Sequence, residues 1–217
     1  MSGAILDPYE RRIISQIKKE ELPQHILLVI ADDDLQTDDD IKKLRAITSW
    51  CAEMGIMRIT MHVSVIDAGE IGRQFCSKLR ERLIKMMDGL PAEITIYTGN
   101  EKVRMRHDKP GASLEISIGY GGRYELTQAI KKIAQEVESG EMTPDDINEA
   151  LIESHLIFKS APDLIIKTGG VRLTDFLIWQ SVYSELYFTD VNWSGFRKVD
   201  LLRAIRDFQR RQRRFGK

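Results

Sequence analysis

The sequence contains few cysteines, no long apolar run and no excess of charge of either sign. Its two cysteines, Cys51 and Cys76, lie in segments with helical periodicity, so we expect reduced core thiols and no disulfide or cysteine metal site. No run approaches the about 20 apolar residues of a membrane span, and the N-terminus carries no apolar signal core. These features predict a cytoplasmic protein.

Charge and chain organisation exclude further classes. The sequence has 32 Lys and Arg residues against 33 Asp and Glu residues, which gives no pattern typical of a nucleic-acid binder or a disordered chain. It contains no internal repeat, low-complexity tract or linker. We therefore predict one domain over residues 1–217, with an N-terminal helix in 1–22 and a basic C-terminal helix and tail in 196–217.

Short apolar runs alternate with helical patterns along the chain. The runs predict strands at 26–31, 57–63, 93–98, 114–118, 164–166 and 186–188. Helical patterns occupy 7–20, 38–55, 70–87 and 123–139, begin again at Pro144 and Arg172, and fill 196–215. This alternation predicts an α/β fold with a mostly parallel central sheet flanked by helices. Asp32, Ser64 and Lys167 end three strands, so we expect them at one edge of that sheet.

Six aspartates lie between positions 32 and 40, directly after the first predicted strand. Thr37 or Asp38 is a good N-cap for the following helix, whose dipole the acidic side chains complement. Clustered carboxylates also suit Mg²⁺ or Ca²⁺, but their spacing does not match a helix–loop–helix calcium loop. We expect a solvated acidic loop that caps a helix and repels free polyanions.

The C-terminal third contains a strand, a glycine turn and a predicted helix in immediate succession. The apolar run at 164–166 leads into Thr168-Gly169-Gly170, and the helical pattern begins at Arg172. Unpaired backbone N–H groups and the positive end of a helix dipole meet in such a turn, which makes it a natural anion site. Lys167 and Arg172 bracket the turn with positive charge.

This region resembles the C-terminal signature of the cis-prenyltransferases, the undecaprenyl and dehydrodolichyl diphosphate synthase family. The family signature reads R-T-G-G-E-x-R-L-S-N-F-L-L-W-Q, followed by Y-x-E-L-x-F. Residues 167–188 follow it with a lysine for the first arginine and without the glutamate after the glycine pair. Gly119-Tyr-Gly-Gly-Arg123 is similar to the family's N-Y-G-G-R, and the resemblance spans nearly the whole chain, more weakly in the front half.

The resemblance implies specific roles for several side chains. It implies that isopentenyl diphosphate is bound by Lys167, Arg172 and Thr174, and that Mg²⁺ is bound by Asp32 and Glu185. It also implies an apolar tunnel for the growing prenyl chain. The residues alone equally fit a structural turn stabilised by local ion pairs.

The front half departs from the family at the loop that holds the allylic diphosphate. The family pattern is H-x-x-x-I-M-D-G-N-x-R-W-A, whereas residues 30–37 read I-A-D-D-D-L-Q-T. Asp32 falls on the family aspartate, but Asp33-Asp34 replace Gly-Asn and the Arg-Trp-Ala part is missing. Glycine permits the close backbone approach that a diphosphate needs, and carboxylates oppose it. The second family loop, F-S-x-E-N-x-x-R, is represented by residues 63–68 without its asparagine and arginine.

Near its end the chain carries Arg214-Phe215-Gly216, which fits the family's Arg-x-Gly motif. Cis-prenyltransferases are dimers in which this motif reaches the isopentenyl diphosphate of the partner chain. Arginine suits that task because its planar fork pairs with phosphate oxygens bidentately. By composition alone the segment is a solvated basic helix end.

The main hypothesis is a subunit of a cis-prenyltransferase complex. The chain resembles accessory subunits that lack the phosphate loop but keep the dimer surface and the Arg-x-Gly tail. It would pair with a catalytic homologue in an Mg²⁺-dependent heterodimer and supply Arg214 and Gly216 in trans. One alternative is a self-sufficient homodimeric prenyltransferase with a modified donor loop around Asp32, and another is a non-enzymatic scaffold of the same fold. The lipid product of either enzyme could bring the protein to a membrane surface.

Other side chains are assigned ordinary structural roles. We expect the basic segment 102–109 to form a solvated loop, and Trp179, Tyr183 and Tyr187 to lie in the core or at a dimer contact. The four histidines lack an evident nucleophile or acidic partner, so we expect core or surface roles for them.

Overall fold

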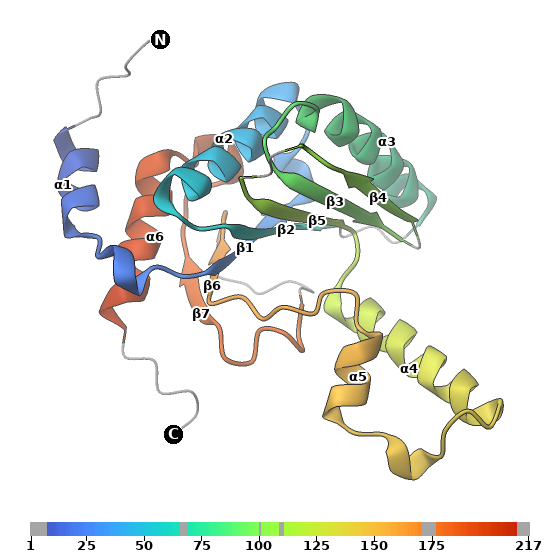
Figure 1. Ribbon diagram of the computed structural model, residues 1–217. Helices are drawn as coiled ribbons and strands as arrows, with labels where there is room; N and C mark the ends of the chain where they lie inside the picture. The colour runs from blue at the N-terminus through green and yellow to red at the C-terminus, as the bar shows by residue number, and fades with distance from the viewer. Residues whose placement is uncertain (1–7, 66–68, 100, 109–110, 171–176, 212–217) are drawn as a thin grey trace.

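A seven-stranded sheet forms the centre of the computed structural model, which describes residues 8–65, 69–99, 101–108, 111–170 and 177–211 (Figure 1). The strand order is β4-β3-β5-β2-β1-β6-β7, and every neighbouring pair is parallel except β3 with β4. The strands are β1 (His25–Ala31), β2 (Arg58–Ser64), β3 (Glu93–Thr98), β4 (Glu101–Met105), β5 (Ser113–Ile118), β6 (Leu164–Lys167) and β7 (Glu185–Phe188). The predicted α/β fold with a mostly parallel sheet is confirmed.

Helices cover the sheet on one side and extend away from it on the other. They are α1 (Pro8–Gln16), α2 (Asp38–Met54), α3 (Glu70–Met87), α4 (Gly122–Glu138), α5 (Glu149–His155) and α6 (Lys198–Arg210). Short 3₁₀ turns are η1 (Lys19–Glu21), η2 (Asp32–Asp34), η3 (Pro144–Asp146) and η4 (Trp193–Gly195). Figure 1 shows α2, α3 and α6 over one face of the sheet, α1 beside α6, and α4 with α5 as a projecting arm. No helix in the described part of the chain is long and apolar enough to cross a membrane.

Strand β1 shows why the central strands read as continuous apolar runs. Its Ile26, Leu28 and Ile30 pack into the core beneath α2, α3 and α6, while Leu27 and Val29 pack into a second cluster on the opposite face. Successive side chains of a strand point to opposite faces, so a strand covered on both faces must be apolar at every position.

The basic segment 102–109 was expected to be a solvated loop, and this expectation is wrong for its first part. Glu101–Met105 forms β4, an antiparallel edge strand paired with β3. Gly99, with φ 55°, lies in the reversal between the two strands. Val103 and Met105 are partly buried, whereas the charged residues Glu101, Lys102 and Arg104 are exposed. Charged side chains are common on edge strands because they discourage pairing with other chains.

The helix expected from Arg172 is not present in its described part. Residues 178–183 form turns, in which the Ser184 N–H donates to the Ser181 carbonyl at 3.0 Å. The Gln180 side chain points inward and donates to the Phe158 carbonyl at 2.6 Å. This buried contact favours a turn over the helix that the local pattern predicts. The predicted start of the helix, at residues 171–176, lies outside the described residues.

Both terminal helices are shorter than predicted. Helix α1 ends at Gln16, and Lys18 has an extended backbone with φ −87° and ψ 124°. Helix α6 ends at Arg210, because Arg211 takes an extended conformation with φ −83° and ψ 140°.

Candidate functional site

Three predicted site positions meet where the parallel strands have their carboxyl ends, here called the carboxyl edge of the sheet. In the register of the parallel strands, Ala31 of β1 pairs with Ser64 of β2, and Val29 pairs with Lys167 of β6. Asp32 follows Ala31 directly, so Asp32, Ser64 and Lys167 end their strands at one edge, as predicted. The Thr168-Gly169-Gly170 turn continues from Lys167 at the same edge.

The backbone N–H groups of the glycine turn are already occupied. The Thr168 N–H donates to the Val29 carbonyl at 3.3 Å, and the Gly169 N–H donates to the Val191 carbonyl at 3.0 Å. The Gly170 N–H donates to the carbonyl of the residue after β7, at 3.3 Å. The expectation of unpaired N–H groups is therefore wrong at these three positions. The segment after β7 satisfies two of them internally, which no local sequence pattern reveals.

Lys167 is a buried cation, with only 7% of its surface exposed. Its Nζ donates to the Thr168 carbonyl at 2.6 Å. Burial lowers the pKa of Lys167, while the nearby Asp34 carboxylate opposes that shift. A buried ammonium group of this kind needs a negative partner or strong acceptors, and here both come from the chain itself.

Asp34, the last residue of η2, lies against the glycine turn. Its Oδ2 is 3.9 Å from the position that a Cβ atom would take at Gly169. Burial raises the pKa of Asp34, while a hydrogen bond from the Trp193 backbone and the charge of Lys167 lower it. The neighbouring Leu35 is fully buried in the main core and anchors the segment.

Trp193 holds the two sides of this edge together. It is fully buried, and its Nε1 donates to the Asp40 carbonyl at 3.0 Å. Its own carbonyl accepts a 2.8 Å hydrogen bond from Lys43 Nζ. Trp193 therefore connects the segment after β7 to the first turns of α2 and to Asp34. Neither Trp193 nor Lys43 was predicted from the sequence, because neither belongs to a motif and their hydrogen-bond partners are distant in the sequence.

The remaining aspartates of the acidic stretch mostly cap or pair with neighbours. The Thr37 N–H donates to Asp40 Oδ2 at 2.8 Å, and the Asp40 N–H donates to Thr37 Oγ1 at 3.3 Å. This capping box confirms Thr37 as the N-cap of α2. Asp38 pairs with Arg82 at 3.0 Å, and Asp39 with Lys42 at 2.7 Å.

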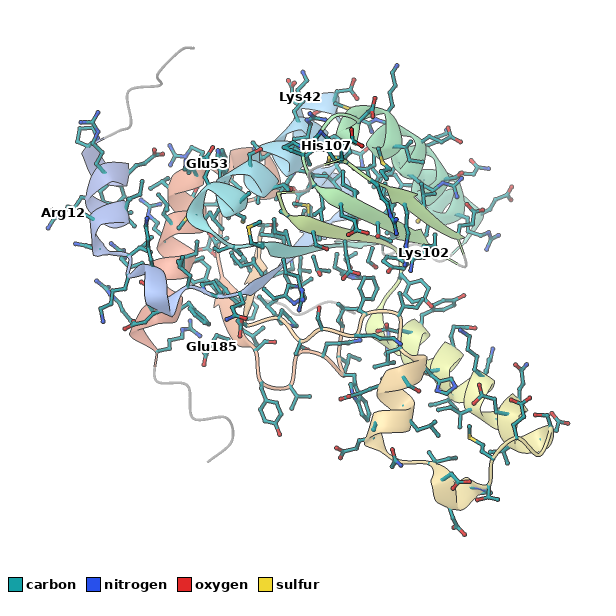
Figure 2. All side chains as sticks on the ribbon, viewed as in Figure 1. Arg12, Lys42, Glu53, Lys102, His107 and Glu185 are labelled. Carbon is teal, nitrogen blue, oxygen red and sulfur yellow. The ribbon has the colours of Figure 1, made fainter. Side chains whose placement is uncertain are left out.

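Glu185 lies at the opposite edge of the sheet from Asp32. It pairs with Leu164, which pairs with Ile26, six residues before Asp32 in the sequence. At about 3.3 Å per residue, roughly 20 Å of strand separates the two carboxylates. Glu185 Oε2 instead accepts a hydrogen bond from Arg211 Nη1 at 3.2 Å. Figure 2 shows Glu185 away from the α2 and α3 side of the molecule.

The Mg²⁺ ion that the resemblance implies therefore does not fit a site made by Asp32 and Glu185 of one chain. Within the described ranges, no group of three His, Cys, Asp or Glu side chains gathers as a metal site. The other predicted diphosphate residues, Arg172, Thr174, Arg214 and Gly216, lie outside the described residues. Arg211, the last described residue, lies beside Glu185.

A cavity of about 620 Å³ opens at the carboxyl edge between α3 and the ends of β2, β3 and β5. Its lining includes Val65, Cys76, Ile118 and Tyr124. Burial raises the pKa of the Cys76 thiol. Deeper between the helices and the sheet, the space is filled by core side chains with at most 1% of their surface exposed: Leu44, Ile47, Leu79 and Leu83.

Comparisons with known proteins agree with this architecture. Residues 68–216 match the family described as "Putative undecaprenyl diphosphate synthase". A tritrans,polycis-undecaprenyl-diphosphate synthase (geranylgeranyl-diphosphate specific) from Methanocaldococcus jannaschii is 34% identical over 259 residues, covering 100% of this chain and 90% of the relative. An isoprenyl transferase from Thermus thermophilus is 32% identical over 249 residues, covering 96% of this chain and 94% of the relative.

Solved structures share the fold at low sequence identity. The structure of lavandulyl diphosphate synthase from Lavandula x intermedia, in complex with dimethylallyl diphosphate, superposes with a TM-score of 0.72. It is 23% identical and covers 91% of this chain and 100% of that one. A probable undecaprenyl diphosphate synthase from Campylobacter jejuni gives a TM-score of 0.70 at 21% identity, with 90% and 99% covered.

This chain is shorter than the archaeal relative over the aligned length. The alignment spans 259 residues, whereas this chain has 217, so at least 42 aligned positions have no residue here. A shorter chain agrees with the missing Arg-Trp-Ala part between β1 and α2.

Proposed function

Because this chain belongs to the cis-prenyltransferase family, we propose that it acts in the synthesis of a polyprenyl diphosphate. The substrates would be isopentenyl diphosphate and an allylic diphosphate. The observation that carries this proposal is the match to relatives named as synthases over 96–100% of the chain, which includes the altered front half.

The first form of the proposal is a self-sufficient enzyme that forms homodimers. From the sequence this was the alternative to an accessory subunit, and the comparisons support it better. The archaeal relatives are named as geranylgeranyl-diphosphate-specific synthases, so geranylgeranyl diphosphate is the allylic substrate we propose first.

The second form is a subunit that needs a catalytic homologue, and the geometry of the carboxyl edge favours it. Asp34 lies against the glycine turn, whose three described N–H groups already donate to carbonyls. Lys167 is buried and bonded within the chain. The last described residue, Arg211, contacts Glu185 at the other edge.

In the proposed reaction, the double bond of isopentenyl diphosphate attacks the first carbon of the allylic substrate as its C–O bond breaks. Pyrophosphate leaves, and the new carbocation loses a proton to give the extended allylic product. In the self-sufficient form, we propose that Lys167, Arg172 and Thr174 face the isopentenyl diphosphate, where cations offset phosphate charge. In the subunit form, the partner chain binds that diphosphate. We assign no step to Mg²⁺, because Asp32 and Glu185 of one chain lie at opposite edges.

The test is condensation by the purified chain with geranylgeranyl diphosphate and labelled isopentenyl diphosphate. Turnover by the chain alone, abolished by Asp32→Ala and retained by the surface control Asp39→Ala, supports the self-sufficient form. Turnover that requires a motif-complete homologue, and falls at least tenfold with Arg214→Ala, supports the subunit form. Absence of condensation in both settings rejects the proposal.

A further inference from the structure

We infer that Asp34 is a specificity-determining residue at the carboxyl edge, and that its carboxylate excludes a diphosphate from the turn after β6. In the folded chain, the Asp34 carboxylate is a negatively charged group that lies against that turn. The inference belongs to the subunit form of the proposed function and takes from it only the class of ligand excluded, a diphosphate.

The space beside Gly169 is already bounded by other parts of the chain. Glycine lets another group approach the backbone closely, because it has no Cβ. At Gly169 the nearest atoms to the missing Cβ are the Asn192 Cα at 3.8 Å and Asp34 Oδ2 at 3.9 Å. The approach that a phosphate oxygen would use is therefore already bounded by a carboxylate oxygen and by the segment after β7.

Asp34 also acts on this turn through its charge. Lys167 is the buried cation of this turn, and Asp34 is the acidic group whose charge acts on its pKa. An arriving diphosphate would bring negative charge next to an existing carboxylate, and like charges in a partly desolvated place repel strongly. One carboxylate thus both favours the charged form of Lys167 and opposes a competing anion.

The neighbours of Asp34 restrict its movement. It lies between β1 and the fully buried Leu35, and the Trp193 backbone hydrogen-bonds its carboxylate. Arg82 Nη1 also donates to the Leu35 carbonyl at 3.4 Å. Displacing the backbone at Asp34 would therefore require moving a buried core side chain.

The same short turn contains a matched control. Asp33 is the residue before Asp34 and has the same charge, but it is exposed whereas Asp34 is partly buried. Removing either charge changes the net charge of the chain equally. Only Asp34→Asn removes the carboxylate that lies against Gly169.

The experiment measures binding of pyrophosphate to the full chain by isothermal titration calorimetry. We expect Asp34→Asn to raise the affinity at least tenfold over the unsubstituted chain, and Asp33→Asn to leave it within twofold. Adding Lys167→Met to Asp34→Asn should remove the gain, which places the bound anion at this turn. Circular dichroism and thermal melts verify that each variant is folded.

Two further ligands distinguish the source of the diphosphate group. Isopentenyl diphosphate binding more tightly than pyrophosphate to Asp34→Asn would assign the unmasked turn to the prenyl substrate. Equal affinities would assign it to the diphosphate group alone, and either result supports the inference.

The inference is overturned if Asp34→Asn binds pyrophosphate no more tightly than the unsubstituted chain, or if Asp33→Asn shows the same gain. It is also overturned if the unsubstituted chain binds pyrophosphate as strongly as Asp34→Asn does and this binding depends on Lys167. The binding assay requires no condensation, so its outcome is separate from that of the proposed function. A chain that never condenses prenyl substrates could still show the Asp34→Asn gain, and an active chain could lack it.

Discussion

The two edges of the sheet hold charged side chains in different ways. At the carboxyl edge, Lys167 is buried against a backbone carbonyl with Asp34 nearby. Trp193 hydrogen-bonds the first turn of α2 beside them. At the opposite edge, where the parallel strands have their amino ends (the amino edge), Glu185 and Arg211 form a partly exposed ion pair. Their side-chain exposures are 25% and 37%. Lys167 and Glu185 belong to one motif-like stretch, yet β6 ends at one edge and the parallel β7 starts at the other. A crossover between parallel strands thus separates residues that are close in the sequence.

The largest effect is expected from removing Trp193 at the carboxyl edge. Trp193→Ala removes a fully buried indole and its hydrogen bond to the Asp40 carbonyl, so we expect a loss of about 3–5 kcal/mol in the free energy of unfolding. Urea denaturation measures it. The control is Trp179→Ala, because Trp179 is only partly buried and hydrogen-bonds Glu153. An equal loss in both variants would show that Trp193 has no special role at this edge.

The second prediction concerns a buried histidine at the amino edge. His25 has 3% of its surface exposed, and burial lowers its pKa to about 4, with Arg58 acting in the same direction and the Ala161 carbonyl and Asp163 opposing. The neutral form of His25 is favoured in the folded state. Its contribution to the free energy of unfolding is therefore fully present above pH 6.5 and is lost as the pH falls toward 4. The shift corresponds to roughly 3 kcal/mol at most.

Urea denaturation between pH 7 and pH 4 measures this loss. We expect His25→Gln to flatten the pH dependence. Identical pH profiles for His25→Gln and the unsubstituted chain would contradict the assignment.

The third prediction compares two glycines with left-handed backbones at the carboxyl edge. Gly119 has φ 62° and Gly169 has φ 67°, so alanine at either position should cost about 1–2 kcal/mol. A Cβ at Gly119 would lie 3.0 Å from Cys76 Sγ, whereas at Gly169 the nearest atom is 3.8 Å away. We expect Gly119→Ala to lose about 1 kcal/mol more, because of overpacking. Thermal denaturation ranks the two, and the reverse order would contradict the geometry.

The smallest effect is expected from the ion pair at the amino edge. A double-mutant cycle of Glu185→Ala and Arg211→Ala should give a coupling below about 1 kcal/mol, because exposed pairs are screened by solvent. A coupling above about 2 kcal/mol would mean that this edge is as tightly held as the edge around Lys167.

Much of the fold could be predicted from local patterns. Each strand at the centre of the sheet is buried on both faces, so residues such as Ile26 and Val29 must both be apolar. The N-cap Thr37 was predictable because capping depends on side chains within one helical turn. The edge strand β4 was missed, because a charged edge strand has no such apolar run. The pairing of His155 with Glu136 at 2.9 Å was also missed, because the two lie on different helices.

By itself, the sequence determined the alternation of strands and helices, the α2 cap and the family, because these depend on periodicity and on motifs read along the chain. Only the tertiary structure decided that the glycine-turn amides donate to the segment after β7, and that Asp34 lies against Gly169. It alone also placed Asp32 and Glu185 at opposite edges. The physical reason is that hydrogen-bond partners and neighbouring charges come from segments that strand pairing brings together. Local sequence patterns do not predict the order of the strands.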